Sequence, residues 1–95
     1  MRVMAKITMG DAANEKIADG SIGQIIQSAA ERWKPEAMYF CSFDGRRTGY
    51  MVFDMADSSD LPEFSEPFFR QLDAQVQVTP AMNGEDLQQG LSQLS

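Results

Sequence analysis

The chain has 95 residues, of which 43% are hydrophobic and 23% charged, and these values are typical of one globular domain. Its net charge of −6 would repel nucleic acid and an anionic membrane surface alike, so we expect neither as a partner. The chain has no histidine, which removes the commonest metal ligand and the commonest general base.

The sequence contains no apolar run of the length that spans a membrane and no signal-peptide pattern at its start. Its single cysteine, Cys41, lies in a predicted strand and suits a buried thiol in a reducing compartment. We therefore expect a cytoplasmic protein. The acidic residues between Asp54 and Glu66 lack the spacing that wraps a calcium ion, and we expect no metal site and no cofactor.

A strand followed by a short helix is predicted at the start of the chain. Residues 2–9 alternate between apolar and polar side chains, which indicates a half-buried strand. Gly10 and Asp11 end this strand, and Asp11 is placed to cap a helix over residues 12–19.

The strongest predicted helix covers residues 22–33. Its apolar side chains recur at helical spacing from Ile22 to Trp33, and Ser21 with Gln24 has the pattern of a capping box at its start. The helix should end at Lys34, because Pro35 disfavours helical geometry in the residue before it.

Residues 37–55 predict a β-hairpin that turns at Asp44-Gly45, a dipeptide that tolerates the positive φ angles of a type I′ turn. This register pairs Phe43 with Arg46 and Tyr39 with Tyr50. One face of the hairpin should then lie in a dry core, with Met38, Phe40, Met51, Phe53 and Met55. The opposite face is mixed in polarity and carries Ala37, Tyr39, Cys41, Phe43, Thr48, Tyr50 and Val52.

Two further helices and a fourth strand are predicted after the hairpin. Helical spacing runs from Ser59 to Leu72, but Pro67 should divide it into two half-helices. Residues 75–82 alternate again, and Pro80 restricts this strand to a sheet edge. A capping box at Asn83 begins a last helix with a narrow leucine stripe, which must dock on its own subunit or on a second one.

The order of these elements predicts a single α+β domain over residues 1–95. It is the ferredoxin-like βαββαβ arrangement, with an extra helix at the C-terminus. Right-handed crossovers place both long helices on one face of a four-stranded antiparallel sheet, with the first and third strands at its centre.

The other face of this sheet is too apolar to stand wholly in water and too polar for a dry core. Its predicted members include Met4, Lys6, Tyr39, Tyr50 and Val52. Because apolar patches of this kind usually mark an interface, we expect a homodimer in which two such faces meet.

The element order and three short stretches resemble the dimeric α+β barrel superfamily, near its muconolactone-isomerase-like branch. The stretches are residues 34–40, 44–50 and 76–80, which read KPEAMYF, DGRRTGY and VQVTP. The resemblance implies ferredoxin-like subunits joined sheet to sheet, in a class that includes cofactor-free isomerases, monooxygenases, haem degraders and ligand-sensing domains. It transfers no catalytic residue, and it disfavours haem, because the haem degraders depend on a histidine ligand.

The candidate ligand-binding residues lie on the mixed face, and they are Lys6, Tyr39, Cys41, Thr48 and Tyr50. Lys6 either pairs with a carboxylate across the dimer or receives an anionic ligand. The functional hypotheses are a homodimer that binds a small polar or anionic molecule, a cofactor-free isomerase or monooxygenase acting on a small cyclic substrate, and a purely structural or interaction module.

Three side chains outside this set each have two interpretations. Arg46 and Arg47 flank the turn and are either solvated charges or anion receptors above a cavity. Asn14 is either exposed or directed into a pocket between helix and sheet.

Overall fold

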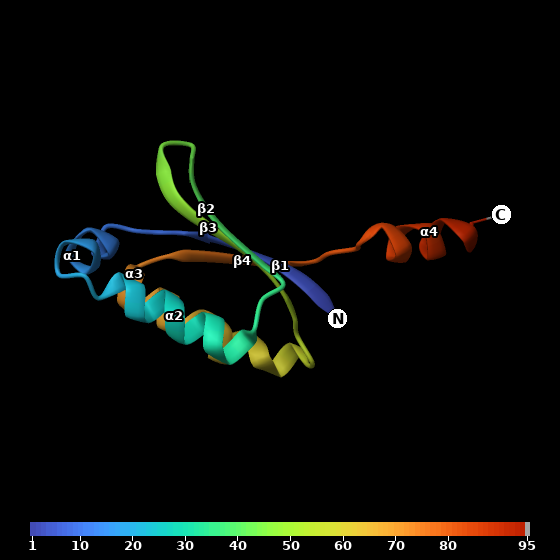
Figure 1. The fold of residues 1–95 in the computed structure, drawn as a ribbon, viewed down its shortest axis with the longest axis horizontal. Helices are drawn as coiled ribbons and strands as arrows, with labels where there is room; N and C mark the ends of the chain where they lie inside the picture. Colours follow the sequence, from blue (N-terminus) through green and yellow to red (C-terminus); the bar gives the residue numbers. More distant parts are fainter. Residues whose placement is uncertain (95) are drawn as a thin grey trace.

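The computed structural model describes residues 1–94 (Figure 1). Four strands and four α-helices follow one another in the order β1 (Arg2–Thr8), α1 (Ala12–Ala18), α2 (Ile22–Trp33), β2 (Ala37–Phe43), β3 (Arg46–Asp54), α3 (Leu61–Leu72), β4 (Gln75–Pro80) and α4 (Gly84–Ser92). A short 3₁₀ helix, η1 (Ser58–Asp60), leads into α3. No helix in this part of the chain has the length and apolar run needed to cross a membrane.

The four strands form one antiparallel sheet in the order β2-β3-β1-β4. Strands β1 and β3 are therefore central, as the sequence predicted. Helices α2 and α3 lie on one face of the sheet and contact each other through Arg32–Glu63 and Trp33–Phe64. Helix α1 stands at the end of that layer (Figure 1). This is the ferredoxin-like arrangement, so the predicted fold class is confirmed.

The predicted register of the β2–β3 hairpin is also confirmed. Phe43 lies opposite Arg46 and Tyr39 opposite Tyr50. Asp44 and Gly45 have φ angles of 53° and 75°, the two positive values that a type I′ turn requires.

An aromatic cluster between the sheet and the helices forms the centre of the core. Trp33 at the end of α2 packs on Phe53 of β3 and Phe64 of α3, with ring centroids 5.5 and 5.7 Å apart. Phe53 stacks on Phe64 at 4.8 Å, and Phe68 extends the cluster at 5.4 Å from Phe64. Offset and tilted ring pairs at these distances stabilise a core beyond the area that they bury.

The prediction that Pro67 divides the third helix is wrong, because α3 runs without a break from Leu61 to Leu72. Pro67 is exposed, so the backbone carbonyl that loses its amide partner belongs to the solvent side of the helix. The opposite side carries the buried Phe64, Phe68 and Leu72, whose packing on the sheet holds the helix in place.

The capping residues agree only in part with the predictions. Asn83 and Asp86 form the reciprocal capping box that the sequence predicted for α4. Asp11 and Ser21 make no side-chain capping bond, because both already have helical backbone angles. The amide of Ser21 instead donates to the Asp19 carboxylate at 2.8 Å.

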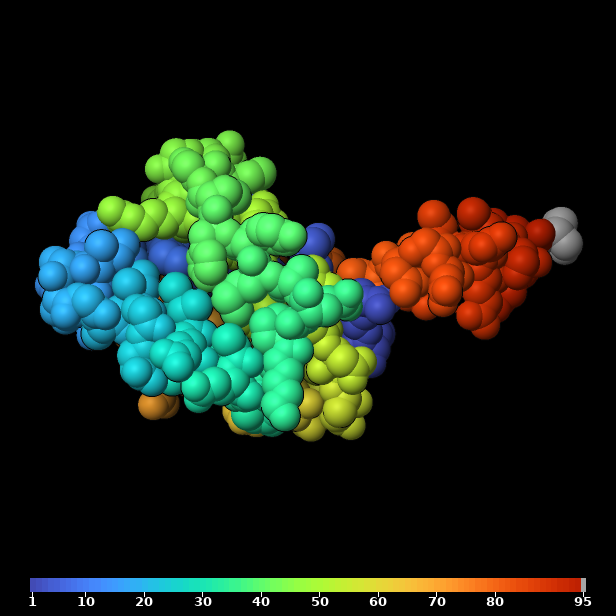
Figure 2. All heavy atoms as spheres, viewed as in Figure 1, coloured from blue at the N-terminus to red at the C-terminus, as the bar shows by residue number. Residues whose placement is uncertain are grey.

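Two parts of the chain extend beyond the core layers (Figures 1 and 2). The β2–β3 hairpin projects past the helices, and its Phe40, which the sequence placed in the dry core, is 53% exposed. A cleft separates Phe40 from α2, and the Phe40 ring instead lies over Gly49 of the neighbouring strand. The second part is α4, which stands away from the body of the domain (Figure 2).

Candidate functional site

The five residues predicted for ligand binding lie on β1, β2 and β3. Tyr39 and Tyr50 face one another across the hairpin, Tyr39 being 71% exposed and Tyr50 half-buried. Cys41 is exposed, so the prediction of a buried thiol is wrong. It belongs to the face of an edge strand that no helix covers. These three side chains remain available to a partner or ligand on that outer face.

Lys6 and Thr48 are less accessible than the sequence suggested. The Lys6 ammonium lies 3.5 Å from the centroid of the Phe43 ring, a cation–π contact that reaches from β1 to β2 across β3. Thr48 belongs to the strand beneath this bridge, and it is only 1% exposed. Its hydroxyl donates to the Arg46 carbonyl at 3.1 Å, so it is a buried and hydrogen-bonded side chain in the single chain.

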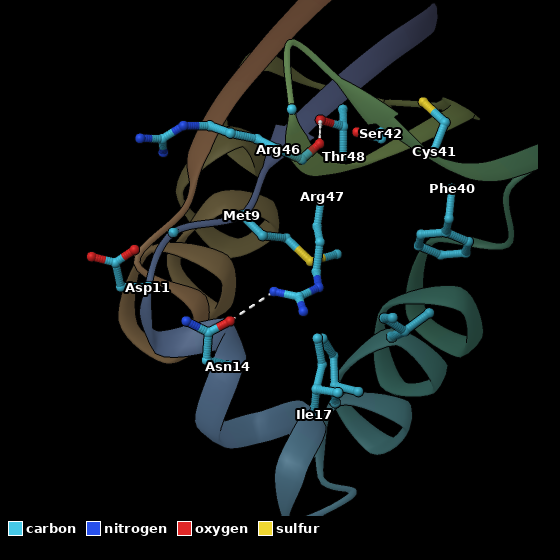
Figure 3. Close-up of a pocket in the computed structure, with 14 residues that line it drawn as sticks. Met9, Asp11, Asn14, Ile17, Phe40, Cys41, Ser42, Arg46, Arg47 and Thr48 are labelled. Atoms are coloured by element: carbon cyan, nitrogen blue, oxygen red, sulfur yellow. Dashed lines mark hydrogen bonds between the residues drawn. The ribbon is translucent and has the colours of Figure 1, made fainter.

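A cleft of about 890 Å³ opens on the helix side of the hairpin, between β2–β3, α1 and the first half of α2 (Figure 3). We call it the Arg47 cleft. Its walls are mostly apolar and include Met9, Ile17, Ile22, Ile26 and Phe40. Pockets that hold small organic molecules have volumes of about 300 to 1,000 Å³ and similar apolar linings.

The guanidinium of Arg47 is the central polar group of this cleft (Figure 3). One of its nitrogens, Nη1, donates to the Asn14 side-chain oxygen at 2.7 Å. A guanidinium has five N–H donors, and within residues 1–94 its side chain makes no other hydrogen bond. Because Asn14 is neutral, the positive charge of Arg47 has no anionic partner in the described chain.

Other arginines of the chain are neutralised. Arg2 pairs with Glu36 at 2.6 Å and with Asp86 at 2.8 Å, and Arg70 pairs with Glu66 at 2.8 Å.

Arg32 holds Glu63 through two nitrogens at 2.7 and 3.1 Å. The hydrogen bond from this guanidinium lowers the pKa of the Glu63 carboxyl below its ordinary value. Arg47 differs from these three paired arginines, because its hydrogen-bond partner is a neutral amide and its guanidinium lies in a cleft.

This arrangement is suited to binding rather than to bond-making chemistry. An arginine fork receives a carboxylate through two parallel hydrogen bonds, and the apolar walls receive a hydrocarbon body. The Cys41 side chain is directed away from Arg47 (Figure 3). Residues 1–94 contain no group of three or more acidic or cysteine side chains that could hold a metal ion.

The sequence contained a signal for this cleft that the interpretation did not use. The predicted hairpin register already puts Arg47 on the same face as Met51 and Phe53, the face that the helices cover. Asn14 was named as a group that could point into a pocket between helix and sheet, and it does line the cleft. What the pattern could not give is the hairpin's projection, which leaves room around Arg47.

The fold and the site together define the class of this protein: a ferredoxin-like α+β domain with a cleft beside its hairpin whose central polar group is Arg47. The chain belongs to the family described as "Domain of unknown function (DUF3303)", which matches residues 22–95.

A solved structure titled "De novo designed protein Ferredog-Diesel" is similar to the chain, with a TM-score of 0.51 at 12% identity over 84% of this chain and 85% of that one. At this identity the likeness concerns the fold alone. No curated protein matches the chain.

Proposed function

We propose that this domain binds a small organic monoanion, a carboxylate with an apolar body, in the Arg47 cleft. The observation that carries the proposal is the guanidinium of Arg47, fixed by Asn14 and otherwise unpaired within residues 1–94, in a cleft with apolar walls. A charge of this kind attracts an anion, while Ile17, Ile26 and Phe40 offer contact to a hydrocarbon chain or ring.

The charge of the surroundings favours a monoanion over a phosphate. Asp11 also lines the cleft, and the whole chain carries a net charge of −6. Arg46 also lines the cleft, but its side chain is directed away from the Arg47 guanidinium (Figure 3). A doubly charged phosphate beside Arg47 would therefore meet one guanidinium and this negative background, whereas one carboxylate matches one arginine fork.

Hexanoate is a suitable probe, because it joins one carboxylate to a short apolar chain, and 1-hexanol is its neutral match. We expect hexanoate to shift the amide NMR signals of α1, α2 and the hairpin, and hexanol to bind at least about tenfold more weakly, as the loss of a charged hydrogen-bond pair implies. Arg47→Gln should weaken hexanoate binding by a similar factor. Lys34→Gln removes the same charge at the far end of α2 and should leave the affinity within about twofold.

Equal hexanoate affinity in the parent chain and in Arg47→Gln would refute the proposal. Shifts confined to the outer face of the sheet would refute it as well, and they would favour the site first predicted around Lys6, Tyr39 and Tyr50. Circular dichroism of each variant checks that its fold is intact.

We also propose that two copies join through the outer face of the sheet, as in the dimeric α+β barrel superfamily, and that the protein works in the cytoplasm. Exposed apolar side chains on that face support the dimer: Tyr39 is 71% and Met4 41% exposed, with Val52 half-buried beside them. An unpaired, exposed thiol at Cys41 supports a reducing compartment.

Sedimentation velocity tests the dimer. We expect a dimer at micromolar concentration and its dissociation in Met4→Glu, since a buried unpaired charge opposes association. Glu31→Gln, a change at an exposed position of α2 on the opposite side of the sheet, serves to show that charge alone does not alter the result. A parent chain that stays monomeric would remove this part of the proposal without affecting the hexanoate experiment.

An enzymatic role has less support than binding. The isomerase or monooxygenase hypothesis needs Lys6, Tyr39 and Tyr50 to converge on a substrate, and none of the three lines the Arg47 cleft. Lys6 is engaged with the Phe43 ring. A cavity between two outer faces is the condition under which that hypothesis would regain support.

A further inference from the structure

Helix α4 and the residues just after it present an exposed leucine stripe. Leu87, Leu91 and Leu94 recur at positions i, i+4 and i+7, and they are 46%, 55% and 74% exposed. Met82, just before the helix, is 66% exposed. We call residues 82–94 the arm.

The arm is joined to the body by very few interactions. The amide of Ala81 donates to the Arg2 carbonyl at 3.0 Å, which continues the β4 pairing by one residue. Beyond that point the Arg2–Asp86 ion pair at 2.8 Å is the single side-chain hydrogen bond between the arm and the rest of residues 1–94. The radius of gyration, 15.0 Å, exceeds the value of about 12 Å for a compact chain of this length, as the extended arm requires.

The sequence nevertheless specifies this segment as a helix. Its first turn is closed by a reciprocal capping box between Asn83 and Asp86. A helix of nine residues is shorter than the length of about 12 to 15 at which isolated helices become marginally stable. A capped helix with an exposed apolar stripe and so few contacts to its own domain is suited to dock on another molecule.

The outer side of β2 has the complementary properties. This edge strand exposes Tyr39 and Phe43, at 71% and 44%, on the face that no helix covers. The turn that follows carries Arg46, which the register puts on the same face as Phe43 and which forms no salt bridge with residues 1–94. The charged residues of the arm are both acidic: Asp86 pairs with Arg2, and Glu85 forms no salt bridge with residues 1–94.

The topology shows how two copies can bring these parts together. Strand β4 runs parallel to β3, so the arm leaves the sheet at the end opposite the hairpin turn, and β4 and β2 are opposite edges. The arm and the hairpin turn are thus at diagonally opposite corners. Two outer faces can meet around a two-fold axis that runs along the other diagonal of the sheet. This axis brings the arm of one copy to the hairpin corner of the other. The strands of the two sheets then cross almost at right angles, a known mode of sheet packing.

We propose that the arm is exchanged between two copies of this chain, so that the leucine stripe of each copy covers the outer side of β2 in the other. The inference rests on the homodimer proposed above, and it assigns to the arm the task of holding that dimer together. The two contacts are equivalent by symmetry, which means that each arm residue acts twice in one dimer.

Disulfide trapping in the full chain tests the exchange, because Cys41 lies on the outer side of β2 between Tyr39 and Phe43. Leu91→Cys puts a second thiol on the stripe, and Gln89→Cys puts one on the other face of the same helix. With diamide as the oxidant, Leu91→Cys should become a covalent dimer on a non-reducing gel. Gln89→Cys should give at least about tenfold less, and Leu91→Cys in a Cys41→Ser background should give none.

Each remaining outcome overturns the exchange. A faster-migrating monomer after oxidation means that the arm folds back on its own hairpin. Equal trapping of Leu91→Cys and Gln89→Cys means random collision. No trapping while sedimentation shows a dimer refutes the exchange alone, whereas no trapping with a monomer refutes the homodimer as well.

Leu91→Asp gives an independent measurement. Because Leu91 is 55% exposed on a helix that stands away from the body (Figure 2), this change should leave the thermal unfolding of the body within about 2 °C. The dissociation constant of the dimer should rise by at least about tenfold, as it does when a central apolar anchor is lost. An unchanged constant would contradict the role given to the arm.

Discussion

Gly10→Ala adds a single methyl group, and we expect it to lower the free energy of unfolding of the domain strongly. Gly10 follows β1 and meets the turn between α3 and β4, where its amide donates to the Leu72 carbonyl at 2.9 Å. A Cβ atom at this position would lie 2.0 Å from the Asp73 carbonyl oxygen and 2.9 Å from its carbonyl carbon. Both neighbours are backbone atoms, so no side-chain rotation can relieve the contact.

The cost of Gly10→Ala can be estimated from two terms. Overpacking of a close contact costs about 1 to 3 kcal/mol, and separating the two segments weakens the Gly10–Leu72 hydrogen bond, which contributes about 0.5 to 1.5 kcal/mol. We expect a loss of about 2 to 4 kcal/mol in the free energy of unfolding. A domain of 95 residues is stable by about 5 to 14 kcal/mol, so the variant should still fold.

Thermal unfolding followed by circular dichroism measures this effect, and the melting temperature should fall by about 10 to 20 °C. Gly23→Ala is the matched control, because a Cβ there meets nothing within 4 Å and Gly23 lies in the first turn of α2. That change should be neutral or stabilise the domain by up to about 1 kcal/mol. If Gly10→Ala melted at the parent temperature, the close approach of these two segments would be wrong.

Three further predictions follow from α3, α4 and their contacts. Asn83→Ala removes one half of the capping box and should cost about 1 kcal/mol of α4 stability, seen as faster amide hydrogen exchange there with no change in global unfolding. Pro67→Ala restores an amide donor to α3 and should raise the free energy of unfolding in urea by about 1 to 3 kcal/mol. The lowered pKa of Glu63 means that its contribution is present at neutral pH and is lost as the pH falls through that pKa. The urea midpoints of the parent and Glu63→Gln should therefore converge as the pH falls below the ordinary pKa of a glutamate. Arg32→Gln should show the same convergence, and midpoints that stayed apart at low pH would contradict this assignment.

The fold was predictable because its decisive signals are local. The Asp44-Gly45 dipeptide fixes the hairpin turn, and the turn fixes the register of every pair from Phe43–Arg46 onward. The alternation of residues 2–9 and the stripe of α2 then leave few topologies that obey short, right-handed connections.

The errors have a common physical cause, which is that periodicity gives the face of a residue but not how far the covering layer extends. Phe40 was assigned to the core by its face, yet a cleft separates it from α2 and leaves it 53% exposed. Thr48 was assigned to the open face, yet Lys6 and Phe43 meet above its strand. Both results depend on contacts between distant segments, which one strand's pattern does not contain.

The same reasoning explains the candidate site. Arg47 lies on the helix face by parity, but only the three-dimensional arrangement shows that α1 and α2 leave a space there and that Asn14 reaches its guanidinium. The predicted site on the outer face depends on a partner copy, so it stays a prediction that the dimer experiments address.

The position of Trp33 gives this domain a built-in optical reporter. It is the chain's single tryptophan, it is 8% exposed among the rings of Phe53 and Phe64, and the Arg32 guanidinium lies 4.0 Å from its ring. Its emission should therefore follow the melting of the hydrophobic interior while remaining indifferent to events at α4. Fluorescence can thus time the collapse of the body separately from the association of two molecules, without any attached dye.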